Sequence, residues 1–213
     1  MNRIATSSLL ALALLAAAAS LATAAVPSPV NSTLPACMVL CPLGDIPFTV
    51  IVRDLANNPV AGSSVVISFE GCPNSVHVCP QLPSDPYDVN PALPSLRMFA
   101  DASGSVTFPA RVGGTGPAGC AAVFADGVLM RNYALASPDQ DGDGLTSNLI
   151  NTDHLIFNAK VGTADPTADM DCSGGVVDGA DQVIYFLHGA QSCLGYIDAV
   201  HRRTWGSVKS HYR

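Results

Sequence analysis

The sequence predicts a mainly β protein with a small α module, in which a β-sandwich is followed by two loop–helix units. Two observations support this fold class. Residues 46–136 hold several short runs of β-branched and aromatic residues separated by turn residues, a pattern typical of a sandwich. From residue 137 onward, two apolar runs have helical spacing, and an Asp- and Gly-rich loop precedes each of them.

The amino terminus has the organisation of an export signal. Arg3 supplies a charge, an apolar run covers residues 9–19, and small residues follow. This order predicts a secretory signal peptide over residues 1–25. The apolar run is short for a membrane anchor, and we expect no transmembrane segment in the mature chain. The expected location is secreted, either extracellular or at the cell surface.

Residues 26–136 are expected to form the β domain. The predicted strands are apolar runs bounded by turn residues, and they lie within 48–54, 63–69, 96–108 and 120–135. The last two of these ranges each predict a hairpin, the second around the two-residue turn Asp126-Gly127. Residues 113–119 predict a loop. Residues 80–94 carry several prolines and predict a surface loop or a crossing at the sheet edge.

Three segments of this domain have a familiar order, namely "VIVRDLANNPVAGSSVVISF", "ADASGSVTF" and "AAVFADGV". Their order resembles that of bacterial immunoglobulin-like domains found in surface and adhesin proteins. The resemblance implies an immunoglobulin-like β-sandwich that acts as a spacer or binding scaffold. It implies no chemistry.

The acidic residues indicate a metal-binding function. Seventeen acidic residues stand against ten basic ones, and all the acids except Glu70 are aspartate. The negative balance makes nucleic acid an unexpected partner. Many of the Asp residues lie between positions 139 and 181. Because Asp favours turns and is a hard oxygen ligand, their clustering in an exported chain predicts calcium binding.

The first Asp-rich loop begins like an EF-hand loop. Asp139, Asp141 and Asp143 fit its first, third and fifth positions, and Gly144 fits the bend that follows. The closing carboxylate is missing when the loop is counted forward, because Ile150 occupies its place.

The second loop follows the same pattern with one exception. Asp169 and Asp171 fit the first and third positions, Ser173 takes the fifth, and Gly174 fits the bend. The closing carboxylate is Asp181, which comes one residue late.

Two helices are predicted over residues 153–162 and 181–190, each beginning with Asp. Aligning these helices places Asp153 opposite Asp181, so both become the closing ligands of their loops. The first loop then contains extra residues within 145–150, which a surface loop accommodates at modest entropic cost.

The pair "DQDGDG…NTDHLIF" and "DMDCSGGVVDGADQVIYFLHG" resembles the type I dockerin module. The resemblance implies that residues 137–193 form a paired EF-hand-like loop–helix module with two Ca²⁺ sites, which docks to a cohesin-like or other cell-surface protein. Carried over by position, the metal ligands are Asp139, Asp141, Asp143, Asp153, Asp169, Asp171, Ser173 and Asp181. Ser173 departs from the family pattern because it replaces an acid. Asp178 stays open as a further ligand or an outer-shell residue.

All seven cysteines follow the predicted signal peptide and predict disulfides in an exported chain, with one thiol left over. The expected pairs are Cys72 with Cys79, Cys172 with Cys193, and Cys120 with Cys37 or Cys41. Residues 194–213 form a basic tail, for which a frayed end and a contact with a surface partner both stay open.

The predicted function is therefore that of an exported, non-catalytic calcium-binding protein. It would serve assembly or attachment in polysaccharide-degrading or cell-surface complexes. One alternative is an adhesin-like structural protein that calcium merely stiffens. A carbohydrate-active enzyme is a further alternative, but it needs two carboxylates beside a cleft. The histidines are scattered and lack an obvious nucleophile partner, so catalysis is not expected.

Overall fold

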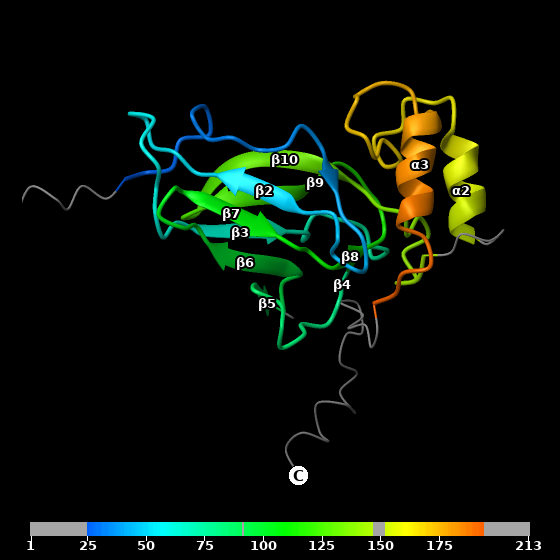
Figure 1. Ribbon diagram of the computed structural model, residues 1–213, viewed down its shortest axis with the longest axis horizontal. Coiled ribbons are helices and arrows are strands. Elements are labelled where there is room, and N and C mark those ends of the chain that lie inside the picture. Colours follow the sequence, from blue (N-terminus) through cyan, green and yellow to red (C-terminus); the bar gives the residue numbers. More distant parts are fainter. Residues whose placement is uncertain (1–24, 91, 147–151, 194–213) are drawn as a thin grey trace, which may run out of the picture.

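The computed structural model describes residues 25–90, 92–146 and 152–193 (Figure 1). The predicted signal peptide, except for its last residue, and the basic tail 194–213 lie outside the described residues. The fold is mainly β, with two short helices side by side at one end of the molecule (Figure 1). Among the described helices, none has the length and apolar character needed to cross a bilayer.

The β part contains one large sheet and two pairs of strands. The strands are β1 (Met38–Val39), β2 (Phe48–Ile51), β3 (Ser64–Ser68), β4 (His77–Val78), β5 (Asp88–Asn90), β6 (Ser95–Phe99), β7 (Ser105–Phe108), β8 (Val112–Gly113), β9 (Gly116–Ala125) and β10 (Val128–Ala136). Six of them form a sheet in the order β1-β10-β9-β3-β6-β5, while β2 pairs with β7 and β4 with β8. Only β1 and β10 run parallel among these pairs.

The main core lies between the six-stranded sheet and the β2–β7 pair. Alternate residues of β3, Val65 and Ile67, are fully buried, as the period of a strand with one inward face requires. In the other layer, alternate residues of β2, Phe48 and Val50, are buried in the same way. The Phe48 ring meets Tyr133 edge-on with the ring centroids 5.6 Å apart, which joins the two layers.

The predicted hairpin at Asp126-Gly127 is confirmed. Val128 lies opposite Ala125, and both turn residues have positive φ, 47° and 80°. The expected loop at 113–119 is partly wrong, because β9 already begins at Gly116.

The hairpin predicted over 96–108 is wrong. Strand β6 pairs with β3 and β5, whereas β7 pairs with β2, so the chain passes from one layer to the other at this turn. The carboxylate of Asp101 accepts the N–H groups of Ser103 and Ser105 and fixes the turn. Apolar runs around a turn have the same appearance in sequence whether they pair with each other or cross between layers. The proline-rich segment lies at the sheet edge, since it contains β5, an outermost strand.

The helices are α2 (Thr152–Lys160) and α3 (Gly179–Leu187). They pack through Phe157 and Tyr185, whose rings stack with their centroids 4.6 Å apart. Both rings belong to a second core that also includes Val39 and Ala136. The helices therefore pack against the end of β1 and β10 rather than standing apart from the β part.

The disulfides differ from all the expected pairs. They join Cys37 to Cys172, Cys72 to Cys120 and Cys79 to Cys193, and Cys41 is a buried free thiol. The expectation favoured cysteines close in sequence, but tertiary packing brings distant ones together. Two bonds link the β part to the helical segment. The three disulfides are compatible with an extracellular location.

Candidate metal centre

Six of the predicted ligands lie in two carboxylate clusters, one at each loop–helix unit. In each cluster, one ligand atom from each of the three side chains lies within 4.8 Å of the others. The clusters consist of Asp139, Asp141 and Asp153, and of Asp169, Asp171 and Asp181. Each unit thus brings two carboxylates from its loop to one from the start of its helix.

Backbone N–H groups of the first loop donate to two carboxylates, one from the loop and one from the helix. The oxygens of Asp139 accept the N–H groups of Gly142 at 2.9 Å and Gly144 at 3.0 Å. From the helix, Asp153 Oδ1 accepts the N–H groups of Gln140 at 2.7 Å and residue 141 at 3.1 Å. Because Asp153 reaches back to the start of the loop, it occupies the closing position.

The second loop repeats this arrangement. Asp169 accepts the N–H groups of Ser173 at 3.1 Å and Gly174 at 2.9 Å. Asp181 Oδ1 accepts the N–H groups of Met170 at 2.7 Å and residue 171 at 3.0 Å. The two closing aspartates therefore make the same contacts, as the alignment of the helices predicts.

Asp143 and Ser173 take equivalent but more peripheral places. Each accepts the N–H two residues further on, that of Leu145 at 2.8 Å and that of Gly175 at 3.3 Å. Asp143 lies outside the cluster of three carboxylates. Ile150 and most of the proposed insertion, residues 147–150, lie outside the described part of the chain.

Asp178 caps α3. Its carboxylate accepts the Ala180 N–H at 2.7 Å, and its own N–H donates to Asp181 Oδ2 at 2.9 Å. The second bond, together with the N–H of residue 181 that Asp178 accepts, forms a capping box. Helix capping therefore accounts for Asp178 without a role as ligand.

The two loops also share their backbone conformation. Gly144 and Gly174 have φ values of 79° and 68°, in the left-handed region that glycine tolerates best. Two residues earlier, Gly142 has φ 74° and Cys172 has φ 61°. The match extends to a non-glycine residue, so the second loop adopts the shape of the first at some steric cost.

The two units pair with each other reciprocally. Past the first loop, the Thr146 N–H donates to the carbonyl of Gln191, beyond α3, at 2.8 Å. Past the second loop, the Val177 N–H donates to the carbonyl of Thr163, beyond α2, also at 2.8 Å. The exit of each loop is thus hydrogen-bonded to the chain that leaves the other helix.

The buried carboxylates carry an electrostatic cost. The exposed fractions of Asp139, Asp153 and Asp181 are 0%, 1% and 1%. Burial, reinforced by the charge of Asp153, raises the pKa of Asp139 to about 7, and burial also raises the pKa of Asp169. Neither Asp139 nor Asp169 forms an ion pair with a described Lys or Arg. A bound cation would compensate these charges, so the residues fit a metal ion.

The first loop is pressed against the β part. A Cβ atom on Gly113, in β8, would lie only 2.1 Å from Asp139 Oδ2. One on Gly142 would lie 2.0 Å from the carbonyl oxygen of Ser75, and the His77 ring contacts the Gly142 carbonyl. The first cluster is therefore shaped by the segments beside β4 and β8 as well as by its own loop.

A third group of possible ligands lies where the β part meets α3. Cys41, Asp45 and His188 also have ligand atoms within 4.8 Å of one another. Burial, with a contribution from Asp45, raises the pKa of the Cys41 thiol to about 12. Sequence reasoning missed this group. The leftover cysteine and its spacing to Asp45 were the available signals, but the approach of His188 depends on tertiary structure.

The three groups suit different chemistry. The two acidic clusters offer only hard oxygen atoms, whereas the third adds sulfur and nitrogen, which softer cations prefer.

No protein-family model matches this chain, and searches of the curated proteins and of the solved structures find no match.

Proposed function

We propose that this chain is an exported calcium-binding protein whose two loop–helix units each hold one Ca²⁺. The first site would use Asp139, Asp141, Asp143 and Asp153, and the second would use Asp169, Asp171, Ser173 and Asp181. Calcium favours six to eight oxygen ligands, so backbone carbonyls and water would complete each set. The β part is proposed to be an immunoglobulin-like scaffold.

One observation carries this proposal, which is the repetition of a closely similar set of hydrogen bonds in two loops of different length and sequence. In both loops, the first aspartate accepts N–H groups around the bend. The closing aspartate, Asp153 or Asp181, accepts the two N–H groups at the loop start. An ordinary acidic turn needs no carboxylate from a following helix. The repeat, together with the burial of both closing carboxylates, supports two equivalent cation sites of the EF-hand kind.

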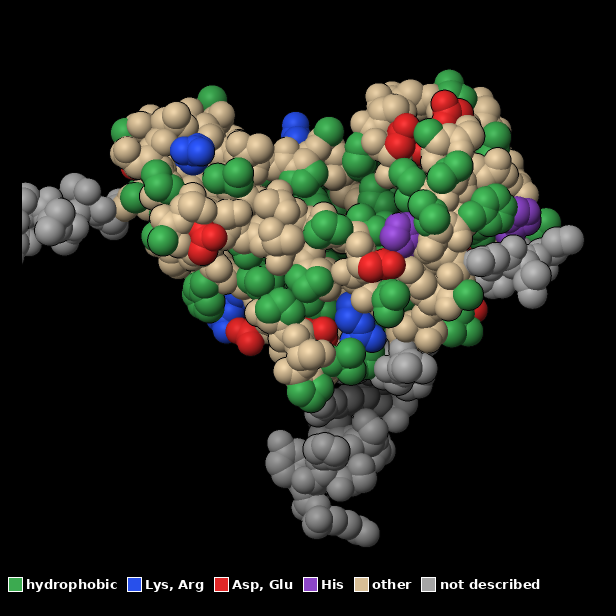
Figure 2. Space-filling model, in the orientation of Figure 1, with side chains coloured by type: hydrophobic (Ala, Val, Ile, Leu, Met, Phe, Trp, Pro, Cys, Tyr) green, Lys and Arg blue, Asp and Glu red, His purple; other side chains and the backbone are tan. Residues whose placement is uncertain are grey.

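We further propose that the helical segment docks a protein partner, of the cohesin-like kind that the dockerin resemblance implies. Leu155 of α2 and Val183 and Leu187 of α3 are 60%, 59% and 72% exposed. Figure 2 shows hydrophobic side chains on this end of the molecule as well as over the β part. Calcium would order the loops that position the helices, so metal binding would favour docking.

A second function is supported by the links between the two parts of the chain. The disulfides of Cys37 with Cys172 and of Cys79 with Cys193 join the helical segment to the β part, and Val39 and Ala136 share its core. These links favour a calcium-stiffened surface protein, in which the bound ions would stabilise the β part and the helical segment as one unit. A pull-down with cohesin domains separates the two functions. Capture that requires calcium supports docking, and its absence in a protein that binds two Ca²⁺ supports stiffening.

Calorimetric titration with Ca²⁺ tests the binding proposal. The full chain should bind two ions, and the variants Asp153→Asn and Asp181→Asn should each bind one. The amide keeps an oxygen that can accept the loop N–H groups, so the lost ion reflects the lost charge. The control Asp88→Asn removes an exposed acid of β5 and should leave two ions bound. Stoichiometry of zero, or no change in either variant, would contradict the proposal.

A further inference from the structure

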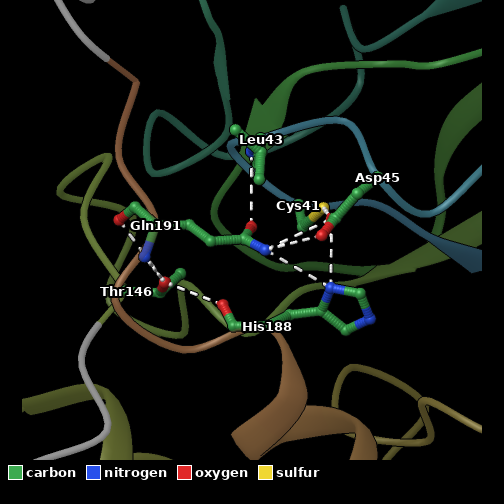
Figure 3. A network of polar contacts seen from close by, with 6 residues as sticks. All are labelled: Cys41, Leu43, Asp45, Thr146, His188 and Gln191. Carbon is green, nitrogen blue, oxygen red and sulfur yellow. Dashed lines mark hydrogen bonds and ion pairs between the residues drawn. The ribbon is translucent and has the colours of Figure 1, made fainter.

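The third group of ligands joins two segments that are distant in sequence. Cys41 and Asp45 precede β2, and His188 is the C-cap residue of α3. The Cys41 thiol donates to Asp45 Oδ1 at 2.8 Å, and His188 Nδ1 lies 3.0 Å from the same oxygen. Figure 3 shows the three side chains pointing toward one another. One thiol, one carboxylate and one imidazole therefore meet at a single point.

We propose that Cys41, Asp45 and His188 form a Zn²⁺ site that is separate from the two acidic clusters. These three side chains are typical zinc ligands, whereas Ca²⁺ takes oxygen ligands. Bonds of about 2.0–2.3 Å in a tetrahedral site place ligand atoms roughly 3.3–3.8 Å apart. The Asp45 oxygen lies closer than this to the Cys41 sulfur and to His188 Nδ1, at 2.8 and 3.0 Å, so a small outward movement of the exposed Asp45 side chain would admit the ion.

The chain holds both ligand-bearing segments in place. Cys37, shortly before Cys41, is bonded to Cys172, and Cys193, shortly after His188, is bonded to Cys79. One bond ties the Cys41 segment to the second loop and the other ties the His188 segment to the β part, both independently of the ion. Little ordering is therefore left for Zn²⁺ binding to impose.

Gln191 orients the carboxylate. Its Nε2 donates to both oxygens of Asp45, at 3.2 and 3.1 Å, and its Oε1 accepts the Leu43 N–H at 3.3 Å (Figure 3). Outer-shell hydrogen bonds of this kind position metal ligands. With three protein ligands, the fourth coordination position stays open to water or another small ligand. The negative charges of a thiolate and a carboxylate would balance the two positive charges of the ion.

Co²⁺ is a suitable probe because its bond to a thiolate has a strong charge-transfer absorption, which oxygen ligands do not produce. Cys41 is the only free thiol among the described cysteines. The full, oxidised chain would be titrated with Co²⁺ in saturating Ca²⁺, so that calcium occupies the acidic clusters. We expect the band to appear with one Co²⁺ per chain and to disappear when Zn²⁺ displaces it. No band in the wild-type chain would overturn the proposal.

Variants identify the ligands. Cys41→Ser should abolish the band, and Asp45→Asn and His188→Gln should each lower Zn²⁺ affinity by at least about tenfold. The control His154→Gln, on α2, should leave the affinity unchanged. If Cys41→Ser fails to fold, the absorption band of the wild-type chain and the Zn²⁺ affinity of His188→Gln, a change at a partly exposed residue, still test the proposal. Zn²⁺ affinity that is equal in wild type and His188→Gln would show that the cluster is only a polar contact between the two segments.

Discussion

At the scale of single residues, the contact between Gly113 and Asp139 determines the shape of the first cluster. A Cβ atom at Gly113 would lie 2.1 Å from the carboxylate oxygen, which is too close for both to keep their positions. The carboxylate is fully buried there and has little room to move aside. A β-strand residue thus constrains a ligand that belongs to another part of the chain.

Gly113→Ala should therefore weaken calcium binding at the first loop by about tenfold or more, since it displaces a ligand, and leave the second loop unaffected. Titration calorimetry would show two unequal sites. Gly179→Ala is the control, because a Cβ there meets nothing within 4 Å. Equal affinity of the first site in wild type and Gly113→Ala would show that Asp139 does not bind the ion from this position.

The raised pKa of Asp139 gives calcium binding a pH dependence. Burial raises it from 3.8 to about 7, so the ion-free folded state holds this proton more tightly than the unfolded state does. Without calcium, the contribution of Asp139 to stability is fully present below the unfolded pKa and is lost as the pH rises through about 7. Calcium requires the ionised form, so protons compete with it below about 7.

We expect the calcium affinity of the first site to rise from about pH 5 to about pH 7 and then to level off. In the chelated protein, the melting temperature should change in the opposite direction over that range. Titrations and thermal melts at matched pH values would measure both trends. An affinity that is flat across the range would mean that Asp139 is ionised without the metal.

At the scale of secondary-structure elements, two neighbouring acids at the start of α3 cap the helix and hold the second loop. Asp178 caps the helix through the Ala180 N–H, while Asp181 both completes the capping box and reaches the loop. Asp178→Ala should cost about 1 kcal/mol of stability through the lost cap. Calcium stoichiometry should remain two. Chemical denaturation and calorimetry measure the two effects, and loss of one ion would make Asp178 a ligand.

The elements also show how far the sequence could predict this structure. The position of Asp153 opposite Asp181 was predictable, because helical periodicity and an acidic residue in the first turn are local signals. The hairpin at Asp126-Gly127 was predictable for the same reason. The crossing at 101–104 and the approach of His188 to Cys41 were not, because both depend on which surfaces pack together. Proximity in sequence was a poor guide to the disulfides for that reason.

At the scale of the whole molecule, the helical segment and the β part are joined by two disulfides and a shared core. Chelation should therefore affect more than the two loops. We expect EDTA to increase amide hydrogen exchange over 137–193 and also over β4 and β8, which lie against the first loop. Exchange in β3 and β6, within the main core, should stay slow. Equal changes in every strand, or no change at all, would contradict this division.

The disulfide pattern also has a consequence for how the protein is made. Cys37 and Cys79 have partners that lie 135 and 114 residues further along the chain. In the order of synthesis, Cys41, Cys72 and Cys79 all precede Cys193. If Cys79 pairs first with one of the other two, that bond has to be opened by thiol–disulfide exchange before Cys79 can bond to Cys193. Oxidative refolding of the reduced chain should therefore be faster with a disulfide isomerase present than without one.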